Sequence, residues 1–279
     1  MRPVADIYLE MVEQISTGLR SPRIKALYLP SGEADAGMDA EFCALELDDG
    51  SVGFSFVRMN GTDRLLRAGG VADTCRGMTA LELACGYPKD DPVAKALGFA
   101  AINALSQSLF TRANWMPPAT GDALGQIDPR SGEHIGMIGL FPPLVGRVTA
   151  ARARLTVLEL RSDLAGEHDG FRVTLAPADL AACEKVLSTC TVMLNDTLDA
   201  VLDACRDARY FSIIGPTAGC LPDPLFERGV DHIGGRRVVD VDGFREAFCE
   251  GRKWGAYTSK YAIVRGEYPG FAELLKQIR

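Results

Sequence analysis

The sequence predicts an α/β protein in which a small α+β domain precedes a Rossmann-like domain with a mainly parallel sheet. In the second half of the chain, short apolar runs alternate with helical stretches, and this order is typical of parallel β-α-β units. In the first half, two strand-like runs flank Asp48-Asp49-Gly50, which indicates an antiparallel hairpin because glycine tolerates the positive φ of a tight turn. With 279 residues, of which 47% are hydrophobic, the chain can bury the cores of two domains.

The first domain is expected to cover residues 1–113. Its opening residues Ile7, Met11 and Ile15 follow the spacing of one helical face. The predicted elements are a helix over residues 1–18, strands over 24–29, 41–47 and 51–57, and helices over 79–85 and 92–111. Asp91 is the expected N-cap of the last helix.

A polar stretch that contains glycine and proline, residues 114–132, is expected to be a linker or crossover between the domains. The Rossmann-like domain then covers residues 133–279 and ends in C-terminal helices. Its predicted elements are strands over 134–140, 154–160, 186–189 and 210–214, and helices over 142–151 and 195–206.

Composition argues against several classes of partner. The net charge of −7, without a run of Lys or Arg, argues against nucleic acid. The most apolar helical run, residues 97–110, is interrupted by polar side chains and is too short to span a bilayer, so no membrane partner is expected. The N-terminus lacks the pattern of a signal peptide, and eight cysteines without a C-x-x-C pair suit reduced thiols, so a cytoplasmic location is expected.

Four places in the second half are candidates for a ligand site. Ligands of open α/β sheets bind beyond the carboxyl ends of the strands, near a point where the strand order reverses. The rule nominates Gly139-Leu140-Phe141-Pro142, Glu159 to Asp163, Thr189 to Thr197 and Gly215 to Cys220. We expect these stretches to converge on one crevice.

The first of these places imitates a dinucleotide-binding unit. Gly136 and Gly139 precede a helix, and Glu159 follows about twenty residues later, where an acid would hold a ribose. Phe141-Pro142-Pro143, however, stands where the third glycine should let the helix approach, so a tight turn into a proline-started helix is the favoured interpretation. Glu159 is either exposed at the sheet edge or directed into the crevice, and both alternatives remain open.

Hydroxyl groups and a thiol gather between Thr189 and Thr197. With the start of the following helix, they could together hold an anion. The favoured interpretation is helix capping, with Asn195 or Asp196 as the N-cap. Acidic side chains at this position would accept a cation more readily than a phosphate.

Two other polar loops are interpreted as ordinary turns. The loop Gly215-Pro216-Thr217-Ala218-Gly219-Cys220 lacks the Gly-Lys-Ser/Thr of a phosphate loop. Glu167-His168-Asp169 is a short polar cluster typical of a solvated turn. No histidine has a second His or Cys at close metal-ligand spacing, so a structural zinc site is not expected.

Seven motifs, in a fixed order along the chain, make the sequence resemble a known family. They are Gly86-Tyr87-Pro88, Ala101-Ile102-Asn103-Ala104-Leu105, Gly136-Met137-Ile138-Gly139-Leu140-Phe141-Pro142, Val157-Leu158-Glu159, Leu194-Asn195-Asp196-Thr197-Leu198-Asp199, Ile214-Gly215-Pro216 and Pro224-Leu225-Phe226-Glu227-Arg228-Gly229-Val230. Together they resemble the "putative heavy-metal chelation" family over most of the chain. The resemblance implies a domain similar to the enolase N-terminal fold, then a Rossmann-like domain, with a site between them. It also implies metal chelation or the handling of a metal-bearing compound.

The resemblance draws attention to two polar residues. Asp196 departs from the family pattern, which more often has glycine at this position. Asn103 lies beside Phe99 and Phe110 on a helical wheel, at the edge of an apolar face. It is therefore either a satisfied boundary asparagine or, as the resemblance implies, a residue of the interdomain site.

Two hypotheses about function follow. In the first, the protein handles a divalent metal ion or a metal-bearing compound through Glu159 and Asp196, with Cys190 as a further ligand. In the second, it is an enzyme that binds a small organic or nucleotide ligand, with Glu159 as ribose ligand or general base. The residues expected to contact the ligand are Asn103, Gly139, Phe141, Glu159, Thr191, Asn195, Thr197, Gly215 and Pro216. No catalytic residue and no other cofactor is assigned, and homo-oligomerisation remains open.

Overall fold

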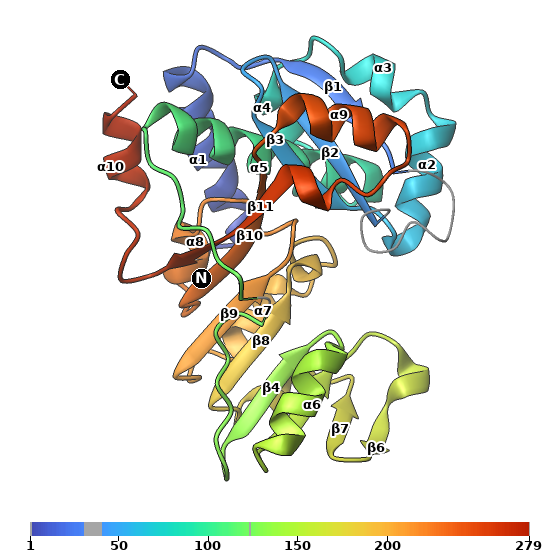
Figure 1. Ribbon diagram of the computed structural model, residues 1–279, viewed down its shortest axis with the longest axis vertical. Helices are drawn as coiled ribbons and strands as arrows, with labels where there is room; N and C mark the ends of the chain where they lie inside the picture. Colours follow the sequence, from blue (N-terminus) through green and yellow to red (C-terminus); the bar gives the residue numbers. More distant parts are fainter. Residues whose placement is uncertain (1, 31–40, 123, 279) are drawn as a thin grey trace.

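The computed structural model describes residues 2–30, 41–122 and 124–278 (Figure 1). The first part of the chain forms α1 (Val4–Gly18), β1 (Ile24–Tyr28), β2 (Phe42–Leu47), β3 (Val52–Phe56), η2 (Met59–Gly61), α2 (Thr62–Ala68), α3 (Val71–Cys75), α4 (Ala80–Ala84) and α5 (Pro92–Arg112).

The remaining chain forms a longer series of short elements. These are β4 (His134–Ile138), α6 (Pro142–Ala150), β5 (Arg154–Leu158), η3 (Ser162–Leu164), β6 (Gly166–His168), β7 (Phe171–Thr174), η4 (Pro177–Leu180), β8 (Lys185–Thr189), η5 (Cys190–Met193), α7 (Leu198–Ala204), β9 (Tyr210–Ile214), α8 (Asp223–Phe226), β10 (His232–Val238), α9 (Val241–Cys249), η6 (Gly255–Tyr257), β11 (Thr258–Val264) and α10 (Phe271–Lys276).

The strands form two sheets. β1, β2 and β3 make a three-stranded antiparallel sheet, and eight strands make the second sheet in the order β11-β10-β9-β8-β4-β5-β7-β6. Neighbouring strands from β10 to β7 are parallel, and only the outer strands β11 and β6 pair in the antiparallel sense. The predicted α/β class, with a small antiparallel sheet and a mainly parallel one, is therefore confirmed.

The helix α5 is the central core helix of the protein. Gly53 on β3 lets the helix approach the antiparallel sheet closely, because a Cβ there would lie 2.1 Å from the Ala100 carbonyl oxygen. All residues from 95 to 110 are buried. At 21 residues, α5 is longer than the apolar run from which a membrane span was excluded, and its length and hydropathy alone would suit a span. However, 89% of its most apolar stretch is buried inside the protein, as expected for a core helix.

The C-terminal part of the chain returns to the first sheet. Figure 1 shows α9 lying across β2 and β3, and hydrophobic side chains of these three elements form one cluster with Trp254. Phe54 of β3 stacks on Trp254 with ring centroids 5.0 Å apart. The antiparallel sheet is thus covered on one face by α5 and on the other by α9.

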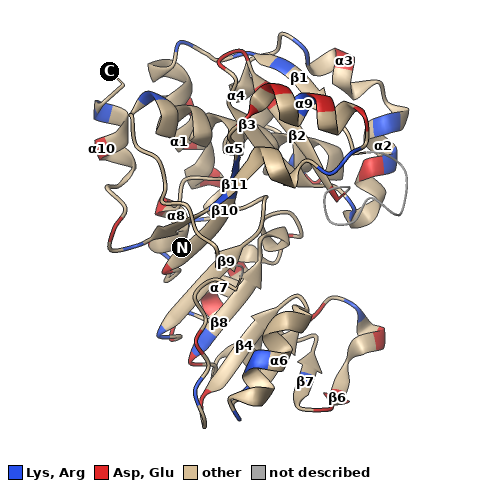
Figure 2. Cartoon of the chain, in the orientation of Figure 1, with Lys and Arg blue, Asp and Glu red and all other residues tan. Residues whose placement is uncertain are grey.

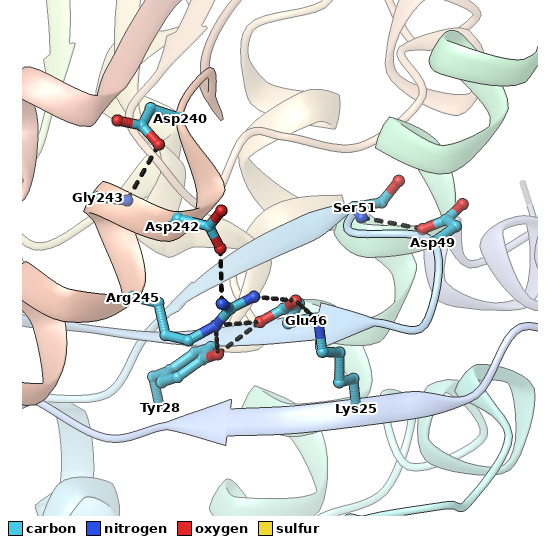
Figure 3. Close-up of polar contacts among 9 residues, drawn as sticks. All are labelled: Lys25, Tyr28, Glu46, Asp49, Ser51, Asp240, Asp242, Gly243 and Arg245. Carbon is cyan, nitrogen blue, oxygen red and sulfur yellow. Dashed lines mark hydrogen bonds and ion pairs between the residues drawn. The ribbon is translucent and has the colours of Figure 1, made fainter.

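A buried carboxylate ties α9 to this sheet (Figure 3). The side chain of Glu46, on β2, is 1% exposed and lies 2.9 Å from Arg245 of α9 and 2.8 Å from Lys25. It also accepts a hydrogen bond from the Tyr28 hydroxyl. Burial alone would raise the pKa of the Glu46 carboxyl, but these hydrogen bonds together lower it below its ordinary value.

Charged residues of both signs occur near the amino ends of the central strands of the parallel sheet (Figure 2). Lys185 lies 3.0 Å from Glu133, and Arg209 lies 3.5 Å from Glu184. Lys185 and Arg209 at the amino edge are thus matched by the carboxylates of Glu133 and Glu184.

Three local structures differ from the sequence-based predictions. The region after β5 contains the β6-β7 hairpin, and the interpretation of Glu167-His168-Asp169 as a solvated turn is right only for Asp169, since Glu167 and His168 are exposed residues of β6. The C-terminal region contributes two strands, β10 and β11, as well as helices. The helix α7 begins at Leu198 rather than at residue 195, because Asp196 adopts a left-handed φ of 60° that a helix cannot contain.

Candidate functional site

The carboxyl ends of β4, β5, β8, β9 and β10 lie along one edge of the parallel sheet, since these neighbouring strands run in the same direction. The residues predicted to contact a ligand form three groups along this edge, and Asn103 of α5 joins one of them.

In the first group, a carboxylate closes the turn after β4. Gly139 adopts φ 77°, and a Cβ there would lie 2.9 Å from the Cγ2 atom of Thr189. Glu159 accepts hydrogen bonds from the backbone N–H groups of Leu140 at 2.8 Å and Leu160 at 3.2 Å. Its half-buried carboxylate is thus engaged by its own turn and by the turn of the neighbouring strand.

The start of α6 offers no free N–H groups to a phosphate. Phe141 is the N-cap, and Pro142 and Pro143 occupy the first two helical positions, where proline has no N–H. The next two donors, Leu144 and Val145, already bond to the Phe141 carbonyl oxygen at 2.9 and 3.2 Å. The helix start therefore lacks the donors on which a dinucleotide pyrophosphate would rest.

The second group surrounds a buried thiol. Cys190 is 2% exposed, and a Cβ on Gly215 would lie 2.4 Å from its sulfur, so the loop Gly215-Pro216 packs directly on the thiol. Burial raises the pKa of Cys190, although hydrogen bonds from Thr217 oppose the rise. The thiol is therefore protonated near neutral pH and is a poor metal ligand. Thr191, which follows at once, donates its hydroxyl to that of the last residue of β8.

Asn103 joins the two parts of the protein at this second group. It is fully buried in α5, which is buried on every side, so it does not lie at the edge of an apolar face as predicted. Its Nδ2 atom donates to the carbonyl oxygens of Phe54 at 2.7 Å and Thr217 at 2.8 Å. The Thr217 hydroxyl in turn accepts from the Phe56 N–H at 3.0 Å. We call these four residues the central seam.

One atom of the central seam is unsatisfied. The Asn103 Oδ1 atom is buried and has no hydrogen-bond partner among the described residues. A buried acceptor without a partner is costly, and in native proteins it usually marks an ordered water, an ion or a ligand. Asn103 is therefore not the satisfied asparagine that one of the two alternatives required.

The third group lies before α7. Asn195 accepts hydrogen bonds from the hydroxyl of Thr197 at 2.6 Å and from its N–H at 3.2 Å. Thr197, rather than Asn195 or Asp196, is the N-cap of α7. Asp196 forms an ion pair with Lys95, whose side chain is 10% exposed. The left-handed φ of Asp196 explains why glycine would also suit this position.

The three predicted metal ligands are not gathered around one point. Glu159 bonds to backbone N–H groups, Asp196 pairs with Lys95, and Cys190 is buried under the loop after β9. Across residues 2–30, 41–122 and 124–278, no three side chains of His, Cys, Asp or Glu come together in a way that could hold a metal ion. The donor atoms of this part of the chain do not form a complete coordination shell for a bare ion.

Sequence reasoning did not single out two residues that organise these groups. Thr217 lies within one of the nominated loops, and its place directly after Gly215-Pro216 at a strand end was the available signal. Lys95 is the one cation in the long apolar helix before residue 112, which was a signal for a buried ion pair.

The fold and these strand-end groups define a class of protein: an α/β protein whose parallel sheet meets a smaller antiparallel sheet at a polar, incompletely satisfied seam. The chain belongs to the family described as "Putative heavy-metal chelation". One family model with this description matches residues 122–265, and a second with the same description matches residues 35–106. The resemblance found in the sequence motifs is thereby confirmed.

Relatives with known structures share this fold. A protein of unknown function from Desulfitobacterium hafniense, of the family matched by residues 122–265, has a TM-score of 0.69 at 20% identity and covers 94% of this chain and 98% of its own. A protein of unknown function from Pyrococcus horikoshii has a TM-score of 0.66 at 19% identity, with 92% and 99% covered. At these identities the likeness concerns the fold alone.

A relative is also found by sequence. An uncharacterised protein of Methanocaldococcus jannaschii is 32% identical over 156 residues, which are 54% of this chain. The matched region spans only 58% of that protein's length.

Proposed function

We propose that this protein binds a metal-bearing organic compound, in which the metal already carries an organic chelator, at the central seam. The observation that carries the proposal is the Oδ1 atom of Asn103, which is buried where β3, α5 and the loop after β9 meet and finds no partner in the described part of the chain. Such an atom is satisfied when a ligand donates a hydrogen bond to it.

The choice of a complexed metal over a bare ion rests on the donor atoms. The family description refers to heavy-metal chelation. The three nominated side chains are each engaged elsewhere, and Cys190 keeps its proton because burial raises the pKa of the thiol. A metal that arrives with its own chelator needs only contacts to the organic part, whereas a bare ion needs several protein ligands.

The alternative function is an enzyme that binds a small organic or nucleotide ligand through Glu159. The bonds of Glu159 to Leu140 and Leu160, and the proline start of α6, count against a nucleotide. An organic ligand without metal remains compatible with the central seam, and the experiment below includes it.

Calorimetry and thermal shift measurements test the proposal on the full chain, purified without an affinity tag. The ligands are Co²⁺ and Ni²⁺ alone, citrate and 1,10-phenanthroline alone, and the preformed metal complexes. We expect at least one complex to bind more tightly than both of its components. Bare ions that stabilise the protein as strongly as every complex would contradict the proposal, and binding of metal-free chelators alone would favour the alternative.

A matched pair of variants tests whether the ligand binds at the central seam. Asn103→Ala and Gln107→Ala each remove a buried amide that donates two hydrogen bonds from α5, since Gln107 donates to the Gly219 carbonyl oxygen and the Tyr261 hydroxyl. Of these two amides, Asn103 is the one whose buried oxygen lacks a partner among the described residues. We expect Asn103→Ala to weaken binding and Gln107→Ala to retain it, at comparable losses of stability. Equal losses of binding would refute the placement.

The expected compartment is the cytoplasm. All eight cysteines are free thiols, and six of them are buried. Free thiols of this number suit a reducing compartment. Localisation of a tagged protein by cell fractionation tests this expectation.

A further inference from the structure

One arginine at the carboxyl edge of the parallel sheet has no partner among the described residues. Arg237 lies near the end of β10, and its Nη1 atom is buried without a hydrogen bond. In the part of the chain that the structure describes, no carboxylate forms an ion pair with its guanidinium. By contrast, Lys185 and Arg209 at the amino edge of the sheet form ion pairs with Glu133 and Glu184.

An unpartnered guanidinium in this setting is costly. Arginine stays protonated at any physiological pH, so it cannot avoid the cost of burial by losing its proton. Its five donors match the geometry of a carboxylate or a similar oxyanion, which they bind through two parallel hydrogen bonds. An anionic group that binds to the guanidinium would satisfy its donors and offset this cost.

The strand order puts Arg237 on the strand next to the one that leads into the central seam. β9 pairs with β10 in parallel, with Ile214 opposite Gly234. Arg237 lies three residues beyond Gly234, and Thr217 of the seam lies three residues beyond Ile214. Arg237 still belongs to the continuing strand β10, whereas the chain turns after β9, with the Ala218 N–H bonded to the Gly215 carbonyl oxygen, so Thr217 lies in the turn that follows the neighbouring strand end.

The alternation of side chains along β10 also shows on which face of the sheet the Arg237 side chain lies. Arg236 points to one face, where its guanidinium lies 5.3 Å from the ring centroid of Trp254. Successive strand residues point to opposite faces, so Arg237 shares its face with Gly235, whose Cβ position would meet the Tyr261 ring. Tyr261 in turn accepts a hydrogen bond from Gln107, one helical turn after Asn103. The Arg237 side chain, with its unpartnered donor, is thus on the side of the sheet that faces α5, which carries the unpartnered acceptor of Asn103.

A second observation agrees with this placement. Burial raises the pKa of the Tyr261 hydroxyl, and the positive charge of Arg237 opposes that rise. This electrostatic effect agrees with a place for Arg237 on the same face of the sheet as Tyr261.

We propose that Arg237 binds a carboxylate of the ligand while the Asn103 Oδ1 atom accepts a hydrogen bond from a hydroxyl group of the same molecule. The ligand class is then a hydroxycarboxylate chelator, which carries both groups and also holds a metal. This inference rests on the proposed function and names the chemistry of the compound that binds there.

The test compares two chelators and three variants by calorimetry on the full chain. Metal–citrate carries carboxylates and a hydroxyl, whereas metal–phenanthroline carries neither. Arg237→Gln removes the charge, Arg237→Lys keeps the charge but not the paired donors, and Arg236→Gln removes the neighbouring charge on the opposite face. We expect Arg237→Gln to weaken metal–citrate binding about 10- to 100-fold, Arg237→Lys to weaken it less, and Arg236→Gln to leave it within about twofold.

Stability of the unliganded protein provides a second readout. Because Arg237 has no partner within residues 2–30, 41–122 and 124–278, its replacement by Gln should not lower the melting temperature of the free protein, whereas replacement of a merely structural arginine would lower it. A lower melting temperature, or metal–citrate binding by Arg237→Gln within twofold of the wild type, would overturn the inference.

The outcomes separate the inference from the function on which it rests. If the wild type binds metal–phenanthroline but not metal–citrate, the hydroxycarboxylate class is refuted and the proposed function stands. If the wild type binds bare ions as tightly as both complexes, the proposed function itself is refuted.

Discussion

Replacing Glu46 by Gln tests how α9 is held on the antiparallel sheet. The carboxylate is almost completely buried, and it is shared by Tyr28, Lys25 and Arg245. Loss of one partner of a fully buried ion pair costs about 3–5 kcal/mol. Here the cost is smaller, because Lys25 is 50% exposed and Arg245 is 35% exposed, so water can solvate both cations. We expect a loss of about 2 kcal/mol.

Urea and thermal denaturation at two pH values measure this loss. At roughly 2–4 °C per kcal/mol, the melting temperature of Glu46→Gln should fall by about 4–8 °C at pH 7. The pKa of Glu46 is lowered in the folded protein, so its contribution is present above the ordinary value of 4.5 and is lost as the pH falls through the folded pKa. The difference between variant and wild type should therefore shrink below pH 4.

The control variant is Asp242→Asn. Asp242 also pairs with Arg245, at 2.8 Å, but its side chain is 92% exposed, so its replacement should cost no more than about 0.5 kcal/mol. A Glu46→Gln variant as stable as this control at pH 7, or one whose deficit is unchanged at pH 3.5, would refute the reasoning.

Three further predictions concern the carboxyl edge of the sheet and the thiols. Gly139→Ala should lower the free energy of unfolding by about 1–3 kcal/mol, because φ is 77° and the new Cβ would lie 2.9 Å from the Thr189 side chain at the end of β8. An unchanged midpoint in urea denaturation would contradict this. Asp196→Ala and Asp196→Gly both lose the ion pair with Lys95, but only glycine accepts φ 60° freely, so the Ala variant should be less stable by about 1 kcal/mol, and equal stability would argue against backbone strain. A thiol reagent at pH 8 should modify the exposed Cys85 and Cys249 quickly and the other six cysteines only on unfolding, whereas fast reaction of a third thiol in the native protein would contradict the burial described here.

Much of the fold is encoded in local sequence patterns. The alternation of apolar runs and helices after residue 133 predicts the parallel strands β4, β5, β8 and β9, and Asp48-Asp49-Gly50 predicts the hairpin between β2 and β3. Asp91 caps α5 as expected, since its side chain accepts a hydrogen bond from the Ala94 N–H at 2.6 Å.

Other parts depend on contacts between distant segments. The strands β6 and β7 are only three and four residues long, too short to show a clear alternation, and the strand β10 carries two glycines and two arginines that hide its apolar pattern. The amphipathic pattern of α9 indicates a helix, but no local signal shows that it packs on β2 and β3 rather than on its own sheet.

The candidate site, too, is predicted only in part by the sequence. The rule of strand ends leads to Gly139, Glu159 and Gly215, because it depends only on topology. It does not say which side chains remain unsatisfied once the chain has folded. The unpartnered atoms of Asn103 and Arg237 depend on three segments that are far apart in sequence, so only the structure identifies them.

A crystal structure with cobalt citrate, with anomalous diffraction measured near the cobalt absorption edge, tests the central claim most directly. If the protein binds a complexed metal as proposed, the cobalt peak lies at the central seam and is coordinated by citrate oxygens, with a citrate carboxylate within hydrogen-bond distance of Arg237 and a citrate hydroxyl at the Asn103 Oδ1 atom. A cobalt peak coordinated by protein side chains such as Glu159 and Asp196, or no citrate at the seam, would contradict it.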